Sequence, residues 1–200
     1  MTDKQSQTLN SMNLLQAKEY YESLGFSVIP LIPGGKKPTC DLVFSKLQPD
    51  YAWAKAPPDA NIGIRCGGKK HLVVLDCDDK LVTGTFTMVI KFLEASGFDT
   101  TRLPIVQTAS KGGAGRHIYL QCVDRKTIKG HIYLLNRSYG TGEIRFGYMV
   151  YVAAPPSILI SKLDSFGIGG TYRIISGSFI ELPIIEPELL IQMRHQGRYG

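Results

Sequence analysis

Two aspartates separated by one residue are the first candidates for chemistry in this sequence. They end the most strand-like segment of the chain, His71–Asp78, in which mostly apolar and β-branched residues precede the acids. Side chains two residues apart in a strand lie on the same face, which places Asp76 and Asp78 about 7 Å apart at Cα. Such a pair would bind Mg²⁺ or Mn²⁺, because these ions prefer carboxylate oxygens and relieve the repulsion between the two charges. The alternative is a strand end whose acids are simply solvated.

A glycine-rich loop that runs into a histidine is the second candidate. Residues 110–117 read Ser-Lys-Gly-Gly-Ala-Gly-Arg-His. The glycines let the backbone approach a ligand closely and offer N–H groups to it, and the two basic side chains add positive charge. Such a loop suits a triphosphate, which makes Ser110, Lys111, Arg116 and His117 candidate nucleotide-binding residues. The alternative is a flexible hairpin loop followed by a histidine that is hydrogen-bonded in the core.

A third acid, Glu143, is followed two residues later by Arg145, so strand alternation places both side chains on one face. Glu143 is then either a third metal ligand or half of a surface ion pair of little energetic value. Further cations, Lys36 in a turn between prolines and Arg65 in a short strand, could contact a phosphate or lie in solvent. Both are retained as candidate nucleotide-binding residues.

The elements that must position these residues follow from the apolar patterns. Helices are predicted where apolar residues recur at helical spacing before a glycine, and strands where β-branched and apolar residues run together or alternate. The expected hairpin, residues 143–146 and 148–154, turns at Gly147. Together these elements indicate an α+β or mixed α/β fold. The expected helices cover residues 14–24 and 85–96, with a short one near Trp53 and a closing helix near the end, and the other strands cover residues 26–33, 61–68, 71–78, 104–108, 116–123 and 171–175.

Composition sets the broad class. The 200 residues are 44% hydrophobic and 20% charged, which excludes a disordered tail or a fibrous repeat and suits one domain or two small lobes. The net charge of +6 suits a partner that carries phosphates. No run approaches the roughly 18 apolar residues that cross a bilayer, and the polar start does not look like a signal peptide. We expect a cytoplasmic protein without a membrane partner.

The cysteines indicate reduced thiols. Four are present, and none forms a CxxC pair, so no structural zinc is expected.

Taken in order, these pieces resemble the bifunctional primase–polymerase domain of the archaeo-eukaryotic primase superfamily. The resemblance covers roughly residues 12–175. Its most specific feature is the order of acid pair, histidine and further acid along the chain. The matching segments are Tyr20 with Gly25–Pro30, then Pro33–Pro38, Asn61–Gly63, Leu75–Asp78, Thr108 with Gly113–Tyr119, Glu143, Ala154–Ser157 and Gly170–Tyr172.

The resemblance implies roles for these residues. Asp76 and Asp78 would bind metal, His117 would contact the phosphates of the incoming nucleotide, and Glu143 would take the place of the family's third acid, where aspartate is commoner. The glycine loop is longer than the family pattern and carries Arg116 directly before the histidine.

The resemblance also implies a fold. The whole chain, residues 1–200, would be one α+β catalytic domain. An N-terminal α/β unit over residues 11–70 would pack on an RRM-like unit over residues 71–180, with the active site between them. Residues 181–200 would form a C-terminal extension.

The implied function is a template-dependent DNA primase and polymerase that acts in replication. It would join NTPs or dNTPs on a single-stranded DNA template by a two-metal mechanism with Mg²⁺ or Mn²⁺. Related proteins often carry a helicase module, so a helicase or other replication proteins are candidate partners, and a plasmid or a virus is a candidate source. Two alternatives stay open: a catalytically inert nucleic-acid-binding module of a replication initiator, and a metal-dependent phosphoesterase or nuclease.

Overall fold

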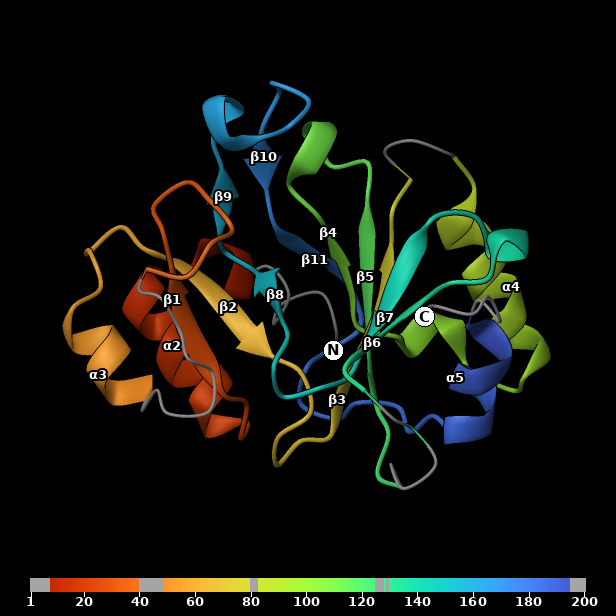
Figure 1. Cartoon of the computed structure of the whole chain (residues 1–200). Helices are drawn as coiled ribbons and strands as arrows, with labels where there is room; N and C mark the ends of the chain where they lie inside the picture. The colour runs from red at the N-terminus through yellow and green to blue at the C-terminus, as the bar shows by residue number, and fades with distance from the viewer. Residues whose placement is uncertain (1–7, 40–48, 80–82, 125–127, 129, 195–200) are drawn as a thin grey trace.

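A computed structural model describes residues 8–39, 49–79, 83–124, 128 and 130–194 (Figure 1). It is a mixed α/β structure with antiparallel sheets, which agrees with the expected α+β class. A three-stranded sheet lies beside α2 and α3, and a six-stranded sheet lies next to α4 and α5 (Figure 1). The α-helices are α2 (Leu14–Ser23), α3 (Pro49–Ala54), α4 (Thr85–Ala95) and α5 (Pro187–Met193), and the 3₁₀ turns are η1 (Thr100–Arg102), η2 (Ser110–Gly112), η3 (Arg137–Tyr139) and η4 (Ser161–Leu163).

Within the described residues, the strands form three antiparallel sheets. Their orders are β1-β2-β8 in the three-stranded sheet, β11-β4-β5-β3-β7-β6 in the six-stranded sheet, and a separate pair of β9 and β10. The strand bounds are β1 (Val28–Leu31), β2 (Asn61–Arg65), β3 (Leu72–Cys77), β4 (Ile105–Gln107), β5 (Arg116–Gln121), β6 (Ile132–Leu134), β7 (Gly142–Arg145), β8 (Tyr151–Ala154), β9 (Ile158–Leu159), β10 (Gly170–Thr171) and β11 (Arg173–Ser176).

Local sequence explains where the two longer helices begin. Asn13 caps α2, because its side chain accepts a hydrogen bond from the backbone N–H of Gln16 and the Gln16 side chain accepts one in return. The carboxylate of Asp79 accepts hydrogen bonds from the first backbone N–H groups of α4, those of Thr85 and Phe86, at 2.7 and 3.3 Å. Both helices confirm the sequence prediction, as does the short helix that contains Trp53.

The six-stranded sheet has a buried apolar layer on each face. Along β3, Val73 and Leu75 pack into a core with α4 and α5, while Leu72 and Val74 pack into a second core with α2 and the three-stranded sheet. Asp76 takes the next position on the second face. The alternation of β3 therefore turns this carboxylate toward the three-stranded sheet, and the candidate site lies between the two sheets.

The predicted hairpin of residues 143–146 and 148–154 is wrong. β7 pairs with β3 and β6, whereas β8 pairs with β2 in the other sheet. The backbone N–H groups of Phe146 and Gly147 both donate to the carbonyl of His131, and the chain then crosses from one sheet to the other. Two apolar strands separated by a glycine suit a hairpin and a crossover equally well, so their partners are decided by tertiary structure.

The same crossover bears on the expected division into units. The sheet that contains β1 and β2 takes its third strand, β8, from the second half of the chain. The chain therefore returns across the expected division near residue 70. The expected units over residues 11–70 and 71–180, and the extension over residues 181–200, stay a prediction.

The strand predicted over residues 171–175 is divided at Tyr172. Residues before it belong to β10, which pairs with β9, and residues after it belong to β11, which pairs with β4. Cys66, Cys77 and Cys122 are buried core residues, and Cys40 lies outside the described residues. None of the helices in the described part of the chain has the length and apolar character needed to cross a bilayer.

Candidate functional site

Three candidate residues lie side by side on adjacent strands. Asp76 on β3 stands directly opposite His117 on β5 in the sheet register, and directly opposite Glu143 on β7 on its other side. Facing Cα atoms of an antiparallel pair are about 4.5–5.5 Å apart, and facing side chains share one face of the sheet. The fold thus brings together an acid, a histidine and a second acid that are far apart in the sequence. We call Asp76, His117 and Glu143 the polar row.

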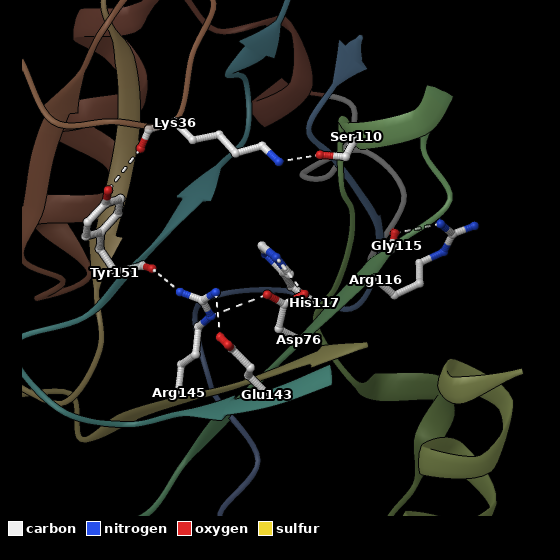
Figure 2. A network of polar contacts seen from close by, with 9 residues as sticks. All are labelled: Lys36, Asp76, Ser110, Gly115, Arg116, His117, Glu143, Arg145 and Tyr151. Atoms are coloured by element: carbon white, nitrogen blue, oxygen red, sulfur yellow. Dashed lines mark hydrogen bonds and ion pairs between the residues drawn. The ribbon is translucent and has the colours of Figure 1, made fainter. Parts of the chain in front are cut away.

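One guanidinium connects the two acids of the polar row. Arg145 Nε lies 3.3 Å from Asp76 Oδ2, and Arg145 Nη2 lies 2.7 Å from Glu143 Oε2 (Figure 2). Arg145 Nη1 donates to the carbonyl of Tyr151 on β8, 3.3 Å away, which ties the row to the three-stranded sheet. The side chains of Asp76, Arg145 and Glu143 are 20%, 27% and 33% exposed. The Glu143–Arg145 pair is therefore part of a half-buried network that includes Asp76, and differs from an isolated surface ion pair.

His117 completes the row and is almost fully buried. Its Nε2 lies 3.5 Å from Asp76 Oδ1, and its ring centroid lies 6.1 Å from that of Tyr172. Burial raises the pKa of Tyr172, and the nearby Asp76 charge adds to this, so the phenol stays protonated at neutral pH. The uncharged phenol of Tyr172, which lies between β10 and β11, is therefore a neighbour of the polar row.

A cavity of about 390 Å³ opens between the two sheets in front of Asp76 and His117, and Glu143 is not among the residues that line it. This is within the usual size range of small-ligand sites. Its wall combines charged and hydroxyl side chains with the apolar chain of β8. The lining residues are Lys36, Asp76, Thr108, Ser110, His117, Arg145, Met149, Val150, Tyr151, Val152, Ala153 and Tyr172.

Polar groups from two distant loops meet at this cavity. The Lys36 ammonium donates to Ser110 Oγ, and the Tyr151 hydroxyl donates to the Lys36 carbonyl at 3.1 Å (Figure 2). Two buried atoms of the lining, Thr108 Oγ1 and His117 Nδ1, have no hydrogen-bond partner within the described structure. Buried polar atoms are normally satisfied, so these two indicate that the cavity is suited to a polar ligand.

The glycine-rich loop is folded into a compact turn. Gly112 and Gly113 have φ values of +65° and +95°, and Lys111 is also left-handed at φ +49°. A Cβ at Gly115 would lie 2.6 Å from Thr108 Oγ1, so only glycine fits beside Thr108. The loop is thus an ordered turn that holds Ser110 at the cavity, which differs from the flexible hairpin loop considered as the alternative.

Arg116 and Lys111 are placed apart from the cavity lining. The Arg116 Nη1 atom donates to the carbonyls of Gly113 and Gly115, at 2.6 and 2.8 Å, and its side chain points away from His117 (Figure 2). Arg116 therefore stabilises the loop on the opposite face of β5. Lys111 contributes its backbone N–H to Asp164, while its exposed side chain lies over the Phe166 ring.

Two further candidates also lie outside the cavity lining. Arg65 stands opposite Tyr151 in the sheet register, and its Nε donates to the Tyr148 carbonyl at 3.3 Å. Burial lowers the pKa of Arg65 below its ordinary value. Asp78 follows the end of β3, and its backbone N–H donates to the Thr141 carbonyl at 2.8 Å. Among the described residues, no three His, Cys, Asp or Glu side chains converge closely enough to hold a metal as they stand.

Sequence reasoning missed several residues of the site. Arg145 was noted only as a partner of Glu143, and its contact with Asp76 depends on the pairing of β3 with β7. Thr108 and Tyr172 belong to matching segments but received no role. The signal that could have found them was their position, since Thr108 lies two residues before the glycine-rich loop and Tyr172 lies two residues after a Gly-Gly pair.

Comparison with known proteins identifies the family of the chain. A search of curated proteins finds no match. The family model of Prim-Pol, described as bifunctional DNA primase/polymerase, N-terminal, matches residues 17–188, which include the polar row and every residue that lines the cavity. The chain belongs to the Prim-Pol family.

Proposed function

We propose that this protein is a template-dependent nucleotidyltransferase that synthesises primers and extends them on single-stranded DNA during replication. The observation that carries the proposal is the polar row of Asp76, His117 and Glu143 on adjacent strands, beside a cavity that Lys36 and Ser110 also reach. Family membership supports DNA primase and polymerase activity in general. In this reading the six-stranded sheet and α4 make up the RRM-like unit of an archaeo-eukaryotic primase core.

The cavity would bind the triphosphate of an incoming NTP or dNTP. The Lys36 ammonium and the hydroxyls of Ser110 and Thr108 can donate to phosphate oxygens, and charge-assisted hydrogen bonds are the strong ones. His117 Nδ1, buried without a partner, can donate to the same group. These contacts would hold the α-phosphate near Asp76 and supply much of the positioning on which phosphoryl transfer depends.

The acids of the row would hold Mg²⁺ or Mn²⁺. Asp76 and Glu143 already share one cation, the guanidinium of Arg145, so this carboxylate pair accommodates a positive charge. Carboxylate oxygens are the donors that both ions prefer, and Asp78 lies directly after the end of β3, two residues beyond Asp76. We propose Asp76, Asp78 and Glu143 as the ligands of a two-metal site. The bound ions would activate the attacking 3′-oxygen and neutralise charge on the phosphates.

The test is de novo synthesis by the purified protein. With single-stranded DNA, labelled nucleotides and Mn²⁺, wild type is expected to make oligonucleotides, and Glu143→Gln is expected to make many-fold less product. The matched control is Glu22→Gln, which removes an exposed carboxylate on α2 that pairs with Lys18 in the i,i+4 position. Failure of wild type to make any product with NTPs or dNTPs would contradict the proposal.

One observation favours a second candidate, the catalytically inert nucleic-acid-binding module. Arg145 lies within ion-pair distance of both Asp76 and Glu143, so a side chain of the chain itself already offsets part of their negative charge without a metal. This candidate predicts binding of single-stranded DNA with no change in affinity or thermal stability on addition of Mn²⁺. The assay for primer synthesis also tests the phosphoesterase or nuclease alternative, because such an enzyme would degrade the single-stranded DNA in the presence of Mn²⁺ without needing a triphosphate.

A further inference from the structure

Three segments that are far apart in the sequence form one continuous surface at the mouth of the cavity. They are residues 34–37, residues 110–113 and the arm of residues 158–169, which contains β9 and η4. The backbone N–H of Ile160 donates to the Gly34 carbonyl at 2.9 Å, and that of Gly112 donates to the Gly169 carbonyl at 3.2 Å. Figure 1 shows this arm extending beyond the two sheets, next to the turn that joins β4 and β5. We call this surface the basic rim.

A single buried carboxylate holds the rim together. Asp164 accepts hydrogen bonds from the backbone N–H groups of Lys111 and Gly169, both at 2.9 Å. Burial by itself raises the pKa of Asp164, but these bonds, one from Phe166 and the charge of Lys36 outweigh it and lower the pKa overall. Asp164 therefore stays ionised, with its charge turned inward to the backbone.

The outer side of the rim is positively charged. Lys36, Lys37, Lys111 and Lys162 are all exposed, and the only acid in the three segments is the buried Asp164. The net charge of the whole chain is +6, so the rim holds a large part of the excess positive charge. A surface of this kind attracts a polyanion.

Apolar side chains lie exposed between these lysines. Ile160, Leu163 and Ile168 are 44%, 47% and 60% exposed. The Lys111 ammonium lies 5.4 Å from the centroid of the half-buried Phe166 ring. Cations beside an aromatic ring and exposed apolar side chains are the combination that binds single-stranded nucleic acid, in which phosphates contact the cations and unstacked bases contact the rings.

The geometry points to the basic rim as the binding surface for the single-stranded DNA template. The rim adjoins the cavity, since Lys36 and Ser110 belong to both, so a strand on the rim would lead directly to the bound nucleotide. This inference rests on the proposed function, because it names the surface that presents the template to the polar row. The chemistry it uses is contact of phosphodiesters with lysine and of bases with Phe166 and the neighbouring isoleucines.

The experiment is fluorescence anisotropy of a labelled oligothymidylate with the full chain, without nucleotide or metal. The Lys37→Ala/Lys162→Ala double variant is expected to bind several-fold more weakly. The slope of log affinity against log salt should become shallower by about 1.4, since each phosphate contact contributes about 0.7 for single strands. Phe166→Ala should weaken binding about fivefold or more without changing the salt slope, since it removes stacking and leaves the charges in place.

The matched control is Lys69→Ala/Lys91→Ala, which removes two exposed lysines outside the rim and changes the net charge equally. Rim variants that bind as well as this control would overturn the inference and leave the proposed function intact; the rim would then suit a protein partner. If wild type itself shows no affinity for single-stranded DNA, the proposed function fails together with the rim. Thermal unfolding of each variant checks that the fold is retained.

Discussion

The polar row and the basic rim border the same cavity but are built in opposite ways. The row lies on three paired strands, so its geometry is fixed by sheet register and by apolar layers on both faces. The rim is made of loops and a two-stranded arm that hydrogen bonds and one buried carboxylate hold together. A rigid row suits chemistry that needs fixed distances, and a loop-built rim suits a long, variable strand of nucleic acid.

This comparison predicts that substitutions can abolish primer synthesis by the polar row and DNA binding by the basic rim independently. The largest effect is expected for Asp76→Ala, since Asp76 is the centre of the row and contacts both His117 and Arg145. Primer synthesis should fall by on the order of 10³-fold, because removal of one electrostatic contributor typically costs that much. Binding of single-stranded DNA to the rim should stay within about twofold of wild type, because Asp76 lies outside the rim.

Two measurements check this prediction, primer extension and anisotropy. Asp59→Ala, a change at an exposed aspartate, is a suitable control. Primer synthesis at the wild-type rate by Asp76→Ala would exclude the row as the catalytic site.

His117→Ala should weaken nucleotide binding at the polar row. Its Nδ1 is the buried atom that we expect to donate to a phosphate, so the KM for the triphosphate should rise by about 10-fold or more. Steady-state kinetics on a primed template measures this effect, and template affinity measured in parallel should not change. An unchanged KM and an unchanged kcat would remove His117 from the site.

Asp164→Asn should loosen the rim and leave the row in place. Hydrogen bonds to a charged group contribute about 1.5–3 kcal/mol, so the free energy of unfolding should fall by about 1–3 kcal/mol and DNA affinity should fall with it. Because the pKa of Asp164 is lowered in the folded state, its stabilisation is present above the unfolded-state value of about 3.9 and is lost as pH falls through the folded-state pKa.

Denaturant unfolding at neutral pH and at about pH 3 tests both parts of this prediction. The difference in stability between wild type and Asp164→Asn should shrink at the lower pH. A difference of the same size at both values would show that the carboxylate charge does not hold the rim.

The smallest expected effect concerns Arg145. Its guanidinium shares the carboxylates that we propose as metal ligands, so Arg145→Gln should bind Mn²⁺ several-fold more tightly, and Arg145→Lys should lie between the two. Calorimetric titration of Mn²⁺ without nucleotide or DNA measures this directly. Weaker Mn²⁺ binding by the glutamine variant would show that Arg145 supports the metal site instead of competing with it.

Much of the positioning of the site was predictable, because successive side chains of a strand point to opposite faces. The residues of β3 up to Leu75 are apolar on both faces, which requires a strand that is buried on each side, and the next residue, Asp76, must then point toward one of the two apolar layers. The two longer helices were equally predictable, because apolar residues recur at helical spacing and end before Gly25 and Gly97. By contrast, the role of Arg116 could not be read from the loop, because its guanidinium bonds to carbonyls that the loop turns toward it only after folding.

The amino-acid sequence by itself determined the longer helices, the central strands, the candidate acids and histidine, and the positive charge, because these depend on residue type and on spacing along one segment. Tertiary structure decided which strands pair. It placed β8 beside β2 instead of β7, set His117 and Glu143 on either side of Asp76, and joined Lys36 to Ser110. The physical reason is that register between distant strands depends on the packing of whole faces, which no local pattern encodes.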